Sequence, residues 1–273
     1  MCAAVDITGT TRLFGVLGDP VAQVRAPTLL NAVFAELGTD AVLVPLHVSP
    51  GDLLDAARGL QRLRNLDGLL VTVPHKFAAG ALATRFGDAV RITGSTNALR
   101  READGSWRAE NFDGAGFVLG LAAAGRPVAG RHVSLVGAGG AGSAIAAAVL
   151  DAGCARLSVY DHDRSRTEDL VGRLTGHWPD RAVAVTGPAL SDADIVVNAT
   201  PLGLTPGDPL PFPPERVPTG CLVADIIMKP RETALLTRAA RAGRAVHHGH
   251  HMLDHQVPLY RSFFGLDHAA RRV

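Results

Sequence analysis

One stretch of the sequence decides the fold: His132-Val133-Ser134-Leu135-Val136-Gly137-Ala138-Gly139-Gly140-Ala141-Gly142. Its apolar run predicts a buried strand, the glycines have the G-x-G-x-x-G spacing, and residues 143–150 continue as a predicted helix. Glycines at such a junction let the backbone approach a pyrophosphate, whose charge meets the amides of the helix N-terminus. The stretch predicts a Rossmann-like unit that binds a dinucleotide through Gly137, Ala138, Gly139, Gly140, Ala141 and Gly142.

An acidic residue follows the next predicted strand, residues 157–160. Asp161 lies about 20 residues after the glycines, where dinucleotide folds place the acid that binds the adenine ribose hydroxyls. Asp161 and Asp163 would repel a 2′-phosphate, so the sequence favours NAD. Arg164 and Arg166 are close enough along the chain to keep NADP as an alternative. A glycine-rich turn without a ligand is a second alternative.

Strands and helices alternate in both directions from this stretch, which favours an α/β fold with mostly parallel sheets covered by helices on both faces. We expect a hairpin around Asp104-Gly105 and a surface loop over the proline-rich residues 206–218. The expected strands are residues 13–17, 41–48, 69–73, 132–136, 157–160, 183–185, 195–198 and 222–225. The expected helices are residues 27–37, 53–63, 115–124 and 252–264. Two domains follow, residues 1–113 with a C-terminal return of residues 250–273, and residues 114–249.

Composition limits the possible partners. The 273 residues are 47% hydrophobic and 19% charged, enough for two modest cores. A net charge of +1 without a long basic run argues against binding to nucleic acid. Cys2, Cys154 and Cys221 are few and far apart, which favours neither a disulfide framework nor a closed metal site. Without a leader-like start or an apolar run of about 20 residues, we expect a cytoplasmic protein that does not associate with membranes.

Lys76 follows a predicted buried strand after Pro74-His75, where an α/β sheet opens its ligand crevice. Oxidation of an alcohol requires the hydroxyl proton to leave as hydride goes to nicotinamide. A lysine can accept that proton if desolvation lowers its pKa. A solvated surface lysine is the alternative interpretation.

Two polar residues near the hairpin are further candidates. Asp113 could hydrogen-bond both the substrate hydroxyl and Lys76, or it could cap the helix expected after it. Asn97 could bind a hydroxyl or serve as a turn residue.

Four histidines surround Gly249, and His251 and His255 are four residues apart on the expected terminal helix. This spacing suits a metal pair, but no CxxC or other closed ligand set supports one, and we predict no metal.

The ordered set of motifs resembles the shikimate dehydrogenase family from about Leu13 to the terminal helix. The matching motifs are Gly18-Asp19-Pro20, Val71-Thr72-Val73-Pro74 with Lys76, Asn97, Asn111 with Asp113-Gly114, the glycine stretch, Asn198-Ala199-Thr200, Asp225 with Thr233, and Met252-Leu253 with Gln256.

The resemblance implies an N-terminal substrate-binding, catalytic domain, a Rossmann-like cofactor domain, and oxidation of a ring hydroxyl or reduction of its ketone. Lys76 and Asp113 match the family's catalytic pair. Thr72, Asn97 and Gln256 match positions that hold substrate hydroxyls. The matching cofactor positions are Asn198, Thr200, Ile226, Gly249 and Met252, and for this reason we prefer a role beside the nicotinamide for the histidine-rich segment. A dimer is favoured by the resemblance alone.

The chain departs from the family at the end of the site that binds the substrate carboxylate. The usual Ser-x-Ser-Pro is Val24-Arg25-Ala26-Pro27 here, a usual threonine is Phe112, and a usual tyrosine is Met228. Each lost hydrogen bond to a carboxylate could forfeit roughly 1.5–3 kcal/mol, so ordinary shikimate should be a poor substrate. We expect a shikimate- or quinate-like cyclic hydroxy acid or polyol altered at this end. Either Arg25 restores a carboxylate clamp, or Phe112 and Met228 contact a less polar group.

Two other functions fit parts of the pattern. A methylene-tetrahydrofolate dehydrogenase shares the two-domain outline but would not predict Lys76, Asn97 and Asp113 together. A non-catalytic NAD-responsive binding protein would have no use for the placement of Lys76 and Asp113.

Overall fold

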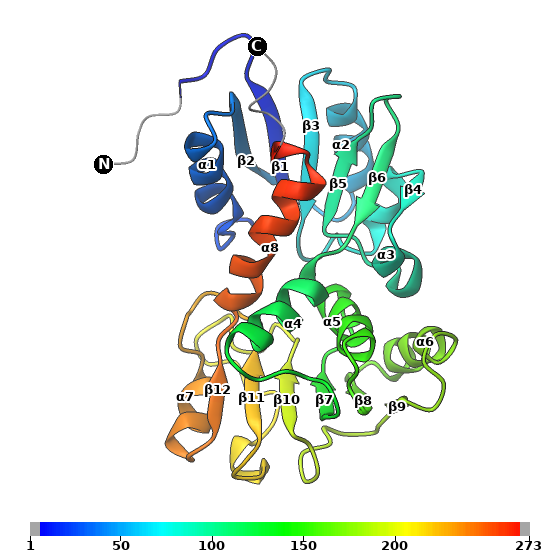
Figure 1. The fold of residues 1–273 in the computed structure, drawn as a ribbon, viewed down its shortest axis with the longest axis vertical. Coiled ribbons are helices and arrows are strands. Elements are labelled where there is room, and N and C mark those ends of the chain that lie inside the picture. The colour runs from blue at the N-terminus through cyan, green and yellow to red at the C-terminus, as the bar shows by residue number, and fades with distance from the viewer. Residues whose placement is uncertain (1–5, 268–273) are drawn as a thin grey trace. The chain divides into compact units, whose positions relative to one another are not determined.

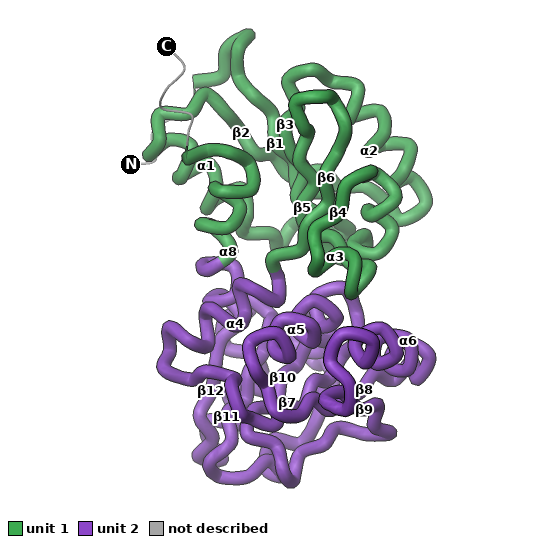
Figure 2. Tube along the Cα trace, turned by 45° about the vertical axis from the view of Figure 1, so that its right-hand side comes forward, with its two compact units in different colours: residues 1–112, 256–273 green, residues 113–255 purple. Residues whose placement is uncertain are grey.

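The computed structural model describes residues 6–267, which form two compact units. Of these, residues 6–112 and 256–267 belong to the first unit, and residues 113–255 belong to the second (Figure 2). The sequence predicts boundaries between the two domains after residues 113 and 249. Asp113 belongs to the second unit because it begins a helix there, and the first turn of the terminal helix belongs with it because His251 packs on Gly120.

The first unit contains a six-stranded sheet in the order β2-β1-β3-β5-β6-β4 (Figure 1). The first three strands are parallel, and β5 runs antiparallel to both β3 and β6. The expected hairpin at Asp104-Gly105 joins β5 to β6, with Gly105 at a φ of 82°. Its elements are β1 (Arg12–Gly18), α1 (Ala26–Glu36), β2 (Ala41–His47), α2 (Leu53–Gln61), β3 (Leu66–Val71), η1 (Ala78–Leu82), β4 (Arg85–Phe86), α3 (Asp88–Thr93), β5 (Ala98–Arg101) and β6 (Trp107–Glu110).

The second unit contains a six-stranded parallel sheet in the order β12-β11-β10-β7-β8-β9. Every residue of β7 is buried, as its apolar run predicts for a central strand. Both neighbours of β7 follow it along the chain, with β8 and β9 on one side and β10, β11 and β12 on the other. The strand order therefore reverses at β7, and ligands of such sheets bind at this kind of switch point. Its elements are α4 (Asp113–Ala123), β7 (His132–Val136), α5 (Gly140–Asp151), β8 (Arg156–Tyr160), α6 (Arg164–Thr175), β9 (Ala182–Ala184), β10 (Ile195–Asn198), η2 (Pro214–Arg216), β11 (Leu222–Asp225), α7 (Ala234–Arg241) and β12 (Ala245–His247).

The terminal helix α8 (His250–Phe263) is divided between the two units after His255. The two-domain α/β fold class is confirmed, with small differences at element ends. β3 ends at Val71, before the loop that leads into Pro74, instead of continuing to Val73. The proline-rich loop contains one short 3₁₀ helix, η2. Among residues 6–267, no helix combines the length and the apolar character that crossing a membrane requires.

Candidate active site

The loops after β1 and β3 lie side by side in the first unit. Thr72 N–H donates to Leu17 O at 2.8 Å, and Asp19 N–H donates to Val73 O at 3.0 Å. A Cβ at Gly18 would come 2.5 Å from Thr72 Cγ2, so glycine is needed for this close approach. The predicted residue Thr72 is thereby placed at the carboxyl ends of two central parallel strands.

Lys76 is held at the same edge of the sheet. Its side chain is buried, with the residue only 8% exposed, which argues against a solvated surface lysine. Its backbone oxygen accepts a hydrogen bond from Thr96 N at 2.8 Å, and Asn97 is the next residue along the chain. The fold therefore brings together Thr72, Lys76 and Asn97, which are separated in sequence.

Asn97 belongs to a buried network of side chains in the first unit. Its Oδ1 accepts from Phe112 N at 2.9 Å, and its Nδ2 donates to Tyr260 Oη at 3.1 Å. The Tyr260 hydroxyl in turn donates to Gln256 Oε1 at 2.5 Å. Tyr260 is a site residue that the sequence motifs did not predict. Its four-residue spacing from Gln256 on a predicted helix places both on one face, but nothing in the sequence indicated that Asn97 would meet them.

The segment that replaces the family's Ser-x-Ser-Pro lies where α1 begins. Val24 and Arg25 are half-buried, and Ala26 is buried as the first residue of α1. Arg25 is the N-cap residue, yet it provides no side-chain cap. Phe112 packs edge-on against Tyr260 and Phe263, with ring centroids 5.5 and 5.4 Å away. Phe112 thus has a clear packing role besides the contact with substrate that we expected.

The glycine loop of the second unit is built by close backbone contacts. Gly137 has a φ of 110°, and a Cβ there would come 2.7 Å from the carbonyl carbon of Ala199. A Cβ at Gly142 would overlap the carbonyl oxygen of Gly137. A Cβ at Gly139 would instead meet no atom within 4 Å, and no side chain caps α5 at this residue. Open space at a helix N-terminus fits the pyrophosphate of a dinucleotide.

Asp161 supports this loop directly. Its Oδ2 accepts from Ala138 N at 2.7 Å, and its Oδ1 accepts from Asp163 N at 2.9 Å and lies 2.9 Å from His162 Nδ1. The carboxylate is thus buried against the protein's own donors, although each oxygen can accept more than one hydrogen bond. Its role as a ribose ligand stays a prediction.

The charged side chains beyond Asp161 pair with one another. A hydrogen bond from the Ser165 hydroxyl lowers the pKa of Asp163 from its ordinary value, so this acid is ionised at neutral pH. Arg166 lies 3.3 Å from Asp163, and Arg164 lies 2.7 Å from Glu168. Both arginines that could bind a 2′-phosphate are thereby partly neutralised.

The remaining predicted cofactor residues of the second unit also gather at the carboxyl edge of its sheet. Asn198 Nδ2 donates to Asp225 Oδ1 at 3.1 Å, and its Oδ1 accepts from both the amide and the hydroxyl of Thr200. A Cβ at Gly249 would overlap the backbone of Ile226, so these two residues are in direct contact. Met252 N–H donates to Gly249 O at 3.2 Å.

Asp225 is the most deeply buried acid in this group. Burial raises its pKa to about 6, even though Thr233, Asn198 and the amide of Ile227 donate hydrogen bonds to its carboxylate. The contacts tie the end of β11 to β10 and to the N-cap of α7, which Thr233 provides. Asp225 therefore holds the edge on which Asn198 and Ile226 lie.

The histidine-rich segment forms a stack of rings. The centroids of His247 and His251 are 4.8 Å apart, and those of His250 and His251 are 4.0 Å apart. Burial and the neighbouring histidines lower the pKa of His247 to about 4, and burial also lowers the pKa values of His250 and His251. These rings are neutral at physiological pH.

The possible metal ligands differ from the pair considered in the sequence. His255 Nδ1 is hydrogen-bonded to His251 O at 2.8 Å. Within residues 6–267, His250, His251 and Asp254 each place one ligand atom within 4.8 Å of the others. The expectation that the chain binds no metal therefore stays a prediction.

Two further predicted residues, Asp113 and Met228, belong to the second unit. Asp113 is buried and is the first residue of α4, so it lies inside the helix instead of capping it. A Cβ at Gly114 would overlap Ala144 O, so α4 packs directly on α5. Met228 is half-buried in the loop after β11.

Known proteins resemble both halves of the chain. Residues 16–99 match the family model described as shikimate dehydrogenase substrate binding domain. A shikimate dehydrogenase (NADP(+)) of Rubrobacter xylanophilus is 41% identical over 266 residues, which cover 96% of this chain and 93% of that protein.

Two solved structures are similar over nearly the whole chain. Quinate dehydrogenase from Corynebacterium glutamicum in complex with NAD is 29% identical, with a TM-score of 0.81 and coverage of 93% of this chain and 94% of that one. Ligand-free 5-ketofructose reductase of a Gluconobacter species is 27% identical, with a TM-score of 0.81 and coverage of 93% and 92%. With its substrate-binding domain, its Rossmann-like domain and a relative of this similarity, the chain belongs to the shikimate dehydrogenase family of oxidoreductases.

Proposed function

We propose that this protein is an NAD-dependent dehydrogenase that oxidises a ring hydroxyl of a cyclic hydroxy acid or polyol, or reduces the corresponding ketone. The observation that carries the proposal is the buried Lys76, held through its backbone beside Asn97 at the carboxyl edge of the first sheet. Buried lysines at such an edge suit proton transfer to or from a substrate.

In this mechanism Lys76 accepts the hydroxyl proton during oxidation and returns it to the alkoxide during reduction. Asp113 orients the reacting hydroxyl and Lys76. It directly follows Phe112, whose amide donates to Asn97 Oδ1. When bound at the glycine loop, the dinucleotide supplies the hydride acceptor or donor.

Our preference for NAD differs from the name of the Rubrobacter relative, which specifies NADP(+). Three features of this chain support NAD: the carboxylates of Asp161 and Asp163, the pairing of Arg166 with Asp163, and the pairing of Arg164 with Glu168. A 2′-phosphate would have to displace these pairs and approach the ionised carboxylate of Asp163. The similar quinate dehydrogenase was solved with NAD.

The substrate differs from ordinary shikimate at the end where the family binds the carboxylate. Val24 and Ala26 provide no hydroxyl there, which leaves Arg25 as the charged candidate in this segment. The substrate could carry a carboxylate, which Arg25 would bind, or lack one. The two similar structures are named for substrates of both kinds, because quinate carries a carboxylate and a ketofructose does not.

The test follows NADH or NADPH formation at alkaline pH with shikimate, quinate, an amino-substituted analogue and carboxylate-free cyclic diols. Lys76→Ala removes the amine, and Lys76→Met removes it while keeping the length of the buried stem. Turnover with NAD that falls by about 10²-fold or more in both variants supports the proposal.

The other outcomes are equally informative. Tight NAD binding without turnover on the whole panel would favour the NAD-responsive binding protein. A preference for NADP would overturn the cofactor assignment alone. For the carboxylate clamp, Arg25→Ala should raise KM for quinate but not for the diols, and an equal KM for quinate would exclude the clamp.

A further inference from the structure

The first turn of α8 brings three possible metal ligands together. His250, His251 and Asp254 each place one ligand atom within 4.8 Å of the other two, and all three belong to the second unit. Asp254 follows His250 by four residues and His251 by three, and both spacings make side chains neighbours on a helix. Two imidazole nitrogens and one carboxylate oxygen are thereby gathered at one place.

The histidine rings are held by neighbouring elements of the same unit. A Cβ at Gly120 of α4 would come 3.2 Å from His251 Cβ, so the two helices touch there. The His251 ring stacks on His247, which is buried and lies edge-on to Phe117 of α4. The ring of His250 lies 4.0 Å from that of His251, between centroids. Ligands that are held in this way lose little conformational freedom when an ion binds.

The two rings are also in the protonation state that ligation requires. Burial lowers the pKa values of both, and for His250 the neighbouring His251 lowers it further. Metal ions bind imidazole in its neutral form. Among residues 6–267, His250 Nδ1 has no hydrogen-bond partner although it is buried, whereas buried polar atoms are nearly always paired. The ring thus has a nitrogen that the described protein groups do not use.

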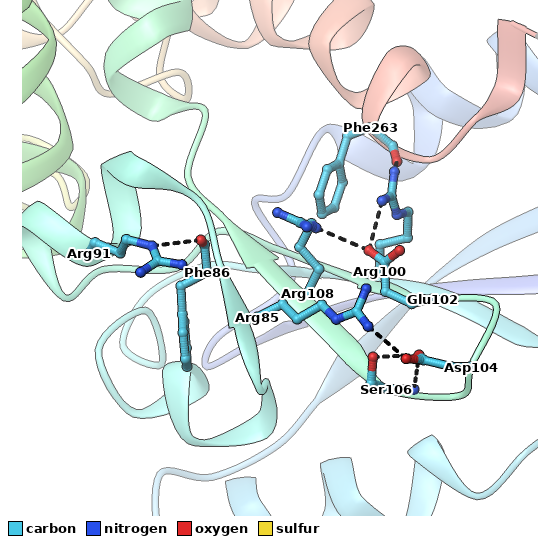
Figure 3. A network of polar contacts seen from close by, with 9 residues as sticks. All are labelled: Arg85, Phe86, Arg91, Arg100, Glu102, Asp104, Ser106, Arg108 and Phe263. Carbon is cyan, nitrogen blue, oxygen red and sulfur yellow. Dashed lines mark hydrogen bonds and ion pairs between the residues drawn. The ribbon is translucent and has the colours of Figure 1, made fainter.

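Another dense group of charged side chains, in the first unit, differs in this respect. In the network of Figure 3, Arg100 and Arg108 share Glu102 at 2.7 and 3.1 Å, and Arg85 lies 2.7 Å from Asp104. A guanidinium group only donates hydrogen bonds and has no lone pair for a metal. Both carboxylates of this network are already paired with cations, so the histidine group is the better metal candidate.

We propose that His250, His251 and Asp254 form a binding site for a divalent transition-metal ion such as Zn²⁺. Two imidazoles with one carboxylate suit this class of metal, whereas Mg²⁺ and Ca²⁺ prefer about six or more oxygen ligands. Zinc ligands about 2.1 Å from the ion lie about 3.4 Å from one another. Binding therefore draws the three groups together, through rotation of the exposed Asp254 and the half-buried His250.

This inference goes beyond the proposed dehydrogenase function and reverses the expectation that the chain binds no metal. That expectation considered His251 with His255, but His255 Nδ1 is hydrogen-bonded to the backbone oxygen of His251. Asp254 supplies a negative charge for the ion. The exposed Arg231 opposes it, because its charge acts on both His250 and His251.

Calorimetric titration of ZnCl₂ into the full chain at neutral pH, without substrate or dinucleotide, tests the site. We expect one ion per chain with a Kd below about 100 µM. Asp254→Asn changes an exposed side chain and should raise the Kd about tenfold or more, because loss of a partner outside the ligand shell already costs about 10–100-fold. His250→Asn should have the same effect. Absence of zinc binding, or an equal Kd in wild type and both variants, would overturn the proposal.

His47→Asn is the matched control. His47 is an exposed histidine 2.7 Å from a carboxylate, that of Asp19, but in the part of the chain that the structure describes this pair belongs to no group of three ligands. The zinc affinity of His47→Asn should therefore equal that of the wild type. A loss as large as in Asp254→Asn would mean that zinc binds adventitiously at exposed histidines, and the proposal would fail.

A second measurement locates the ion and tests its class. The ring ¹⁵N signals of His250 and His251, identified by their loss in the corresponding asparagine variants, should shift when Zn²⁺ is added and stay shifted in excess Mg²⁺. Unshifted signals, or reversal by Mg²⁺, would refute the site. Neither measurement uses turnover, so a failure here leaves the proposed function untouched, and a zinc-binding protein without dehydrogenase activity would count against that function alone.

Discussion

The two units build their candidate sites in different ways. In the second unit, the backbone of residues 137–142 forms the site, and glycine is required because Gly137 contacts Ala199 and Gly142 contacts Gly137. In the first unit, side chains form the site, and Asn97 meets Tyr260 from 163 residues away along the chain. A backbone site made by adjacent residues can be recognised as a motif, whereas a side-chain site made by distant residues becomes visible only in the folded chain.

The largest expected effect tests the backbone-built site. Gly142→Ala places a methyl group against Gly137 O and should lower the free energy of unfolding by about 3 kcal/mol or more, because backbone atoms cannot move aside cheaply. Gly139→Ala is the matched control, since its Cβ meets no atom within 4 Å. It should change stability by only about 0.5 kcal/mol but weaken dinucleotide binding about tenfold or more.

Urea unfolding and calorimetric titration of NAD would measure both quantities. Equal stability of the two alanine variants would contradict the steric account of the loop. Unchanged NAD affinity in Gly139→Ala would mean that the pyrophosphate does not occupy the open space at this residue.

A smaller effect is expected from pH at the histidine stack. The pKa of His247 is about 4 in the folded protein, against 6.5 as its ordinary value, so the unfolded chain binds a proton first as pH falls. The contribution of neutral His247 to the free energy of unfolding is complete above pH 6.5 and is lost as pH falls toward 4. Between pH 7 and pH 5 this contribution falls by about 2 kcal/mol. Asp225 acts in the opposite direction, because its raised pKa of about 6 makes its contribution more favourable at lower pH.

His247→Phe isolates the histidine, because Asp225 is present in both proteins. The difference in unfolding free energy between wild type and variant should shift by about 2 kcal/mol against the wild type from pH 7 to pH 5. A difference that does not vary with pH would show that His247 has the same pKa in the folded and the unfolded chain, which would contradict the lowered value.

The smallest expected effect tests the support of the side-chain site. Arg100→Ala removes the bond to Phe263 O and the contact with its ring, and should cost about 1 kcal/mol of stability. Arg85→Ala is the control, because the pair with Asp104 is about half exposed on both sides and should contribute roughly 0–0.5 kcal/mol. Chemical denaturation measures the loss of unfolding free energy in both variants. Equal losses of stability in the two variants would mean that Arg100 does not anchor α8.

The sequence by itself determined the α/β alternation, the glycine loop, the hairpin and the order of the family's motifs. These features depend on local periodicity or on residues adjacent along the chain, as in β7, whose predicted and observed bounds agree. Candidate residues such as Lys76 and Asn97 could be named because they occur in such motifs.

Only the tertiary structure decided how those residues are held. Asp161 supports Ala138 across the ends of two strands, Phe112 packs on Tyr260, and Tyr260 connects Asn97 to Gln256. The first contact forms only when β7 and β8 pair in the sheet, and the other two form only when the terminal helix has returned to the first unit. Hydrogen bonds depend on distance and direction, and neither quantity can be read from residue type or spacing when the partners are far apart in sequence.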